Sequence, residues 1–161
     1  MKYLVNPESR RHSAIHFGKP EKAGSYFFTS VFQNVEELLT VLEKRDPFSV
    51  IVQSSGREAH TYDLTDIGDC GTVGLGLKCE FTDRKIKMEN RNGIDVQYIE
   101  VDQLHPTSLL TVICFKEEQK YQLITAFPGD YAPAFPHDKM DSDELSWSMA
   151  FWDKHILFKK I

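Results

Sequence analysis

The sequence of this 161-residue chain predicts an α+β fold with a mostly antiparallel sheet. Short β-branched segments follow one another without helices between them, which disfavours a parallel sheet. Two segments have the apolar spacing of amphipathic helices, one before most of these strands and one after them. Length and composition, with 41% apolar and 27% charged residues, are typical of one globular domain over residues 1–161. We therefore expect a twisted antiparallel sheet of about five or six strands and two main helices.

The N-terminal segment predicts a short edge strand followed by irregular structure. Lys2–Val5 has strand composition, and Asn6-Pro7 is expected to end it. The polar segment that follows is interrupted by Gly18, Pro20 and Gly24. Residues 1–24 are therefore expected to include a loop or a loosely ordered arm.

The first helix is predicted from its cap and its apolar stripe. Asn34 has the position of an N-cap, and Glu37 follows at the third helical position. Asp46-Pro47 is expected to end the segment. Four apolar residues between these signals have helical spacing: Val35, Leu38, Leu39 and Leu42.

The middle of the chain predicts a succession of strands. Asn92-Gly93 is a strong hairpin signal between two of them. The glycine-rich segment Ile67–Gly76 lacks the Lys-Ser/Thr pair of a phosphate-binding loop, so we expect a flexible connection there. Strands are expected at Phe48–Val52, His60–Thr65, Lys78–Thr82, Arg84–Glu89 and Ile94–Val101. Tyr26–Thr29 is either a further strand or an apolar segment that leads into the first helix.

Leu104–Phe127 is predicted to be the central hairpin of the sheet. With Glu118-Gln119 as the turn, Val112 is expected opposite Thr125, and Leu110 opposite Phe127. Both faces of this hairpin are apolar, which indicates that it is covered on both sides.

The two threonines of this hairpin, Thr111 and Thr125, are candidates for a polar role. A buried hydroxyl needs a hydrogen-bond partner, although threonine is also a common strand residue. A change of one residue in the turn would bring both side chains to the same face.

The C-terminal part predicts a loop and a second helix. Pro133 and Pro136 disfavour regular structure before Lys139. Carboxylates from Asp141 onward suit a helix N-terminus. The apolar stripe of this helix consists of Leu145, Met149, Trp152 and Ile156.

Composition excludes several classes of function. A net charge of −5 argues against general electrostatic attraction to nucleic acid. No apolar segment has the length of a membrane span, and no secretory signal is recognisable. The simplest interpretation of three cysteines without zinc-binding spacing is reduced thiols in a cytoplasmic protein, and the alternative is a secreted toxin module that crosses an oxidising space. We expect no metal, no cofactor and no membrane partner.

His105 is the histidine that we single out for chemistry. It precedes Pro106, and three hydroxyl side chains follow nearby: Thr107, Ser108 and Thr111. An imidazole in this setting can exchange protons with a substrate, or it can simply cap a loop. His60, which begins a strand beside Tyr62, is a second candidate.

The segments His105–Ile113 and Leu123–Gly129 resemble the C-terminal hairpin of small bacterial ribonuclease toxins of the barnase, EndoU, colicin and RelE-like group. The resemblance covers about a fifth of the chain. In several of those toxins a strand ends in a tetrad like Thr125–Pro128 beside the catalytic groove. The resemblance implies a metal-independent endoribonuclease that cleaves RNA by general acid/base transfer, with RNA and a cognate inhibitor protein as partners.

The same resemblance implies roles for particular residues. His105 or His60 would be the general base or acid, and Thr125 would hold a phosphate oxygen. The predicted substrate-binding positions are Lys78, Arg84, Thr111 and Phe127, and Lys78 or Arg84 would offset the developing negative charge.

Two other functions remain open from the sequence. An acidic, aromatic-rich domain with a Pro-rich loop also suits a non-catalytic α+β protein-interaction module, such as an immunity or phage-associated protein. A small-molecule pocket within the curved sheet is a third alternative. The ribonuclease hypothesis requires His105, Thr125 and a basic residue to converge in one groove.

Overall fold

The computed structural model confirms the predicted α+β class, with mostly antiparallel strand pairing. It describes residues 2–18, 25–53, 55–73, 86–91, 94–99, 105–133, 136–155 and 159–160. Contacts within the chain divide it into two compact units. The first contains Met1–Val73 and Pro106–Tyr131, and the second contains Gly74–His105 and Ala132–Ile161. Each unit is described by itself.

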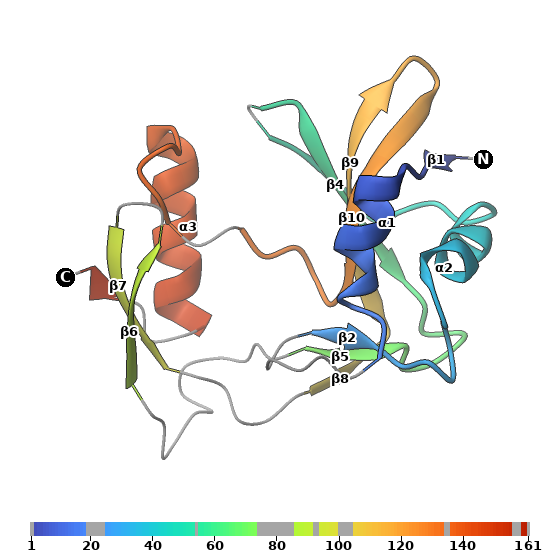
Figure 1. The fold of residues 1–161 in the computed structure, drawn as a ribbon, viewed down its shortest axis with the longest axis horizontal. Helices are drawn as coiled ribbons and strands as arrows, with labels where there is room; N and C mark the ends of the chain where they lie inside the picture. The colour runs from blue at the N-terminus through green and yellow to red at the C-terminus, as the bar shows by residue number, and fades with distance from the viewer. Residues whose placement is uncertain are drawn as a thin grey trace. The chain divides into compact units, whose positions relative to one another are not determined.

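A five-stranded sheet forms the centre of the first unit (Figure 1). Its strands lie in the order β1-β10-β9-β4-β3, and all pairs are antiparallel except β1 with β10. The bounds are β1 Tyr3–Leu4, β3 Ser49–Val52, β4 Arg57–Asp63, β9 Leu109–Glu117 and β10 Lys120–Pro128. The predicted central hairpin is therefore confirmed as β9 and β10, which have neighbours on both sides.

The register of this hairpin differs from the prediction after its first four residue pairs. Glu117 pairs with Lys120 across the Glu118-Gln119 turn, as expected. A bulge between Leu123 and Thr125 then shifts the pairing by one residue. Thr125 consequently lies opposite Ile113, so the predicted pairing of Val112 with Thr125 is wrong.

One face of the sheet packs against helix α2 (Val35–Leu42). The Asn34 side chain accepts a hydrogen bond from the Glu37 N–H at 3.0 Å, which confirms the predicted N-cap. At the other end of the helix, the Lys2 ammonium donates to the Leu42 carbonyl at 3.2 Å. The four predicted stripe residues share one buried cluster with seven residues of this sheet: Tyr3, Tyr62, Leu110, Val112, Cys114, Leu123 and Ala126.

Helix α1 (Pro7–Ala14) was not predicted, and the expectation of a loop from Glu8 onward is wrong for this segment. Asn6 caps the helix by accepting from the Ser9 N–H at 2.8 Å, and Ser9 Oγ accepts from the Asn6 N–H in return. Pro7 occupies the first helical turn, where it costs no hydrogen bond. Asn6-Pro7 therefore begins a helix as well as ending a strand.

A second, three-stranded sheet has the order β2-β5-β8. Its strands are β2 Tyr26–Phe27, β5 Gly71–Val73 and β8 His105–Thr107. The flexible connection predicted at Ile67–Gly76 is thus replaced by a strand over Gly71–Val73.

The second unit contains helix α3 and a separate sheet in the order β11-β7-β6. The predicted hairpin is confirmed by the antiparallel pairing of β6 (Ile86–Arg91) with β7 (Ile94–Ile99). The third strand is β11 (Lys159–Lys160). α3 (Ser142–His155) confirms the second predicted helix, and Asp141 caps it by accepting from the Glu144 N–H at 2.8 Å. The strand predicted at Lys78–Thr82 lies outside the described residues.

Candidate functional site

A hydrogen-bonded polar cluster lies inside the core of the first unit. It consists of Tyr3, Glu58, His60, Tyr62 and Cys114 and is called the His60 cluster below. Alternation along β4 directs its three β4 members to the face that carries Val112 and Cys114. Tyr3 comes from β1, which is the edge strand farthest from β3, and its hydroxyl contacts His60 on the same face.

The cluster is a continuous chain of hydrogen bonds. His60 Nε2 lies 3.0 Å from Glu58 Oε1, and His60 Nδ1 lies 2.7 Å from the Tyr3 hydroxyl. The Tyr3 hydroxyl is also 2.6 Å from the Tyr62 hydroxyl. With a neutral imidazole, each group donates to the next in one direction, from Tyr62 through Tyr3 and His60 to the Glu58 carboxylate. Both ring nitrogens of His60 and both tyrosine hydroxyls of the cluster therefore have a hydrogen-bond partner.

Burial keeps the two tyrosine hydroxyls and the cysteine thiol of the cluster protonated at neutral pH. It raises the pKa of Tyr62 to about 12 and the pKa of the Cys114 thiol to about 12. Burial, followed by the Tyr62 hydroxyl, also raises the pKa of Tyr3. Cys114 Sγ lies 3.8 Å from His60 Nε2, yet a protonated thiol with no exposed surface is not a nucleophile.

The five-stranded sheet separates His60 from the other candidate residues of the first unit. His60 pairs with Val112 and lies on the core face, where its exposed fraction is 2%. The bulge at Ile124 brings Thr111, Thr125 and Phe127 together on the other face. His60 and Thr125 therefore do not converge on one substrate atom.

Thr111 has a structural hydrogen-bonding role. Its buried hydroxyl donates to the Gly129 carbonyl at 2.9 Å and lies 3.2 Å from the Thr61 hydroxyl. Since its one proton goes to Gly129, the Thr61 hydroxyl is the donor of the second bond. Thr111 thus joins β4 to the end of β10.

Replacing Thr111 by valine is expected to lower the free energy of unfolding by about 1–3 kcal/mol, because the buried Gly129 carbonyl loses its donor. Urea unfolding monitored by circular dichroism measures the change. Thr125→Val is the matched control on the same face, and its half-buried position predicts a change within about 0.5 kcal/mol. Equal effects of the two substitutions would contradict the structural role of Thr111.

The remaining candidate residues are His105, Lys78 and Arg84. His105 is half-buried at the start of β8 and belongs to the second unit, whereas Thr125 belongs to the first. The neighbouring Thr107 hydroxyl accepts from the Leu109 N–H at 3.1 Å. Lys78 and Arg84 lie outside the described residues. The predicted roles of these residues stay predictions.

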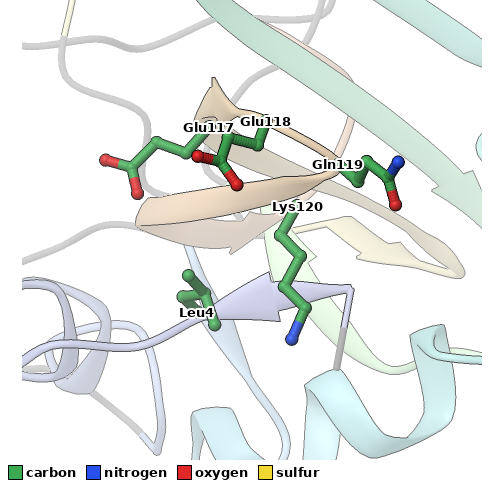
Figure 2. Close-up of a pocket in the computed structure, with 5 residues that line it drawn as sticks. All are labelled: Leu4, Glu117, Glu118, Gln119 and Lys120. Carbon is green, nitrogen blue, oxygen red and sulfur yellow. The ribbon is translucent and has the colours of Figure 1, made fainter.

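A hollow of about 770 Å³ lies at the tip of the central hairpin. Figure 2 shows Leu4 and Lys120 on one side and the carboxylates of Glu117 and Glu118 on the other, with Gln119 at the turn. Among the described residues, those that line this hollow include no histidine and no hydroxyl side chain. Its described lining therefore offers neither an imidazole nor a hydroxyl nucleophile for the predicted acid/base cleavage of RNA.

The described residues form neither a metal-binding cluster nor a membrane-spanning helix. Within the described residues, no three His, Cys, Asp or Glu side chains are placed to hold a metal ion. No helix in the described part of the chain is both long enough and apolar enough to cross a membrane.

No family model, curated protein or solved structure matches the chain.

Strand β3 is the feature whose exposure the sequence analysis missed. It is the last strand of the five-stranded sheet, and its apolar side chains are exposed, with Val52 at 65%. Phe48, Val50 and Ile51 are also exposed. The signal in the sequence was an apolar segment without alternation, which is equally typical of a fully buried strand. Only the order of the strands shows that β3 lies at an edge.

Proposed function

We propose that this chain is a non-catalytic protein-interaction module that binds an extended polypeptide segment as an added strand at β3. The observation that carries the proposal is the open edge of β3, an uncharged strand with exposed apolar side chains. Proteins that bind peptides by strand addition combine backbone hydrogen bonds at a sheet edge with contacts from alternate side chains.

The hydrogen-bond pattern identifies the backbone groups that are available to a partner. The Gln53 N–H donates to the Arg57 carbonyl at 2.8 Å, which makes these two residues a hydrogen-bonded pair. Because such pairs alternate along an antiparallel ladder, Ser49 and Ile51 bond to β4. The N–H and carbonyl groups of Val50 and Val52 consequently face the open edge.

The composition of β3 also favours a binding role. Sheet edges that must not pair are usually protected by lysine, proline or very short strands. The opposite edge strand, β1, has two residues, whereas β3 has four and contains neither lysine nor proline. An edge of this kind is a template for another strand.

Catalysis has less support from the same residues. RNA cleavage without a metal requires two groups on opposite sides of one scissile phosphate. His60 is buried with both ring nitrogens occupied, and Thr111 is committed to Gly129. The ribonuclease function stays a prediction that depends on His105 and on residues outside the described part of the chain.

Peptide binding tests the proposed module. Fluorescently labelled eight-residue peptides of alternating valine and threonine are expected to bind saturably in anisotropy titrations. Val52→Pro should weaken this binding at least tenfold, because it removes an N–H that faces the open edge and bonds to no other strand. Val52→Thr is the matched control, since it keeps both the N–H and the β-branched shape.

Two results would contradict the module. Equal peptide affinities of the Val52→Pro and Val52→Thr proteins would show that peptide binding does not use the backbone of β3. Incubation with total RNA in EDTA provides the other test. Cleavage by the wild type and not by His105→Ala would favour the ribonuclease.

A further inference from the structure

We infer that the strand bound at β3 is β3 of a second copy of this chain, in an antiparallel dimer with two-fold symmetry. This inference rests on the proposed strand-binding function and names the partner. A two-fold interface brings the same surface of both copies together, so that surface must complement itself. The backbone, the side chains and the charge of β3 each meet this condition.

The backbone groups of β3 are self-complementary in one register. Val50 and Val52 carry the outward N–H and carbonyl groups, and they lie symmetrically about Ile51. A two-fold axis at Ile51 places Val50 opposite Val52 of the second copy, and Val52 opposite its Val50. Both pairs are then hydrogen-bonded pairs, and all four outward N–H groups find a carbonyl.

The side chains match in this same register. The two valine pairs lie on one face, and the two Ile51 side chains meet on the other. Ser49 lies opposite Gln53 of the second copy, so polar side chains meet polar ones. Apolar residues therefore meet apolar residues along the centre of the contact.

Charge does not oppose this pairing locally, although the chain carries a net charge of −5. No residue from Phe48 to Gln53 is charged. An unrelated peptide could bind to β3 without any symmetry in the β3 sequence. The outward backbone groups, the apolar residues and the polar residues of β3 are instead arranged symmetrically about Ile51. The contact is short, so we expect weak association with a dissociation constant on the order of 10–100 µM.

Sedimentation of the full chain over a range of concentrations tests the dimer. The wild type is expected to pass from monomer to dimer within that range. Val52→Lys should weaken association at least tenfold, because each copy then places a charge on the paired edge. Ile67→Lys makes a similar change at another exposed apolar residue and should leave association unchanged.

Engineered cysteines test the register. Ile51→Cys is expected to form a disulfide between copies, because opposed residues in a non-hydrogen-bonded pair have Cα atoms about 4.5 Å apart. Val50→Cys is the matched control, since the two Val50 residues lie roughly 9 Å apart in this register, beyond disulfide reach. Both variants are made in a Cys79→Ser background and compared on non-reducing gels. Cys70 and Cys114 are buried.

Three outcomes overturn the inference. The first is a monomer at 1 mM that still binds the Val/Thr peptides, which retains the proposed module and rejects self-pairing. The second is a dimer that Val52→Lys does not weaken, which indicates another interface. The third is faster crosslinking through residue 50 than through residue 51, which rejects the register. Failure of peptide binding and of dimerisation together would reject the module itself.

Discussion

Replacing His60 by alanine is expected to lower the free energy of unfolding by about 3–5 kcal/mol. The substitution removes a ring that is buried against Tyr121, with ring centroids 4.6 Å apart. It also leaves the largely buried Glu58 carboxylate and the Tyr3 hydroxyl without their shared partner. Urea unfolding at neutral pH, monitored by circular dichroism, measures the loss.

His12→Ala is the matched control for this prediction. His12 lies on the exposed side of α1, 3.8 Å from Glu8, and an exposed pair of this kind contributes little. We expect a change within about 0.5 kcal/mol. Similar stabilities of the two alanine variants would contradict a structural role for the His60 cluster.

A milder substitution keeps the prediction testable if His60→Ala does not fold. Tyr3→Phe preserves the buried ring and removes one oxygen, which contacts both His60 and Tyr62. The expected loss is about 1–3 kcal/mol, because two buried polar atoms each lose a hydrogen bond. An unchanged midpoint of urea unfolding would show that the Tyr3 hydroxyl contributes nothing to the stability of the cluster.

Gly71→Ala is expected to lower the free energy of unfolding by about 2–3 kcal/mol. A Cβ atom at residue 71 would lie 2.6 Å from the Tyr26 carbonyl oxygen and 2.8 Å from Pro128 Cβ. The first atom belongs to the backbone of the paired strand β2, and the second to the end of β10. Relief of the overlap therefore requires one of these strands to move.

Gly56→Asn is the control for Gly71→Ala. An added Cβ at residue 56 meets no atom within 4 Å, and asparagine tolerates the positive φ of 87° at this turn. We expect a loss below about 1 kcal/mol in the same urea unfolding experiment. A loss at residue 71 no larger than at residue 56 would contradict close packing of β5 against β2 and β10.

Local sequence signals determined the elements whose caps, apolar stripes or turns lie within the element itself. Asn34 and the apolar stripe after it predicted α2, and the turn at Glu118-Gln119 predicted the β9–β10 hairpin. The cap at Asn6 was equally present in the sequence. Helix α1 was nevertheless missed, because its polar residues give no apolar stripe and Asn6-Pro7 also ends a strand.

Tertiary structure decided the features on which the functional argument depends. The bulge at Ile124 changes which residues share a face with Thr111, and no local pattern distinguished it from a regular strand. The partners of His60 come from residues far apart in the sequence, since Tyr3 reaches it across the sheet.

The position of β3 at the edge of the sheet was likewise decided by the tertiary structure. The segment Phe48–Val52 has the composition of a buried strand, and its residues alone fixed only that it forms a strand. Whether a strand has one neighbour or two depends on the order in which all five strands pair. Strand order is set by contacts between distant segments, so the sequence determined the strand and the tertiary structure made it an open edge.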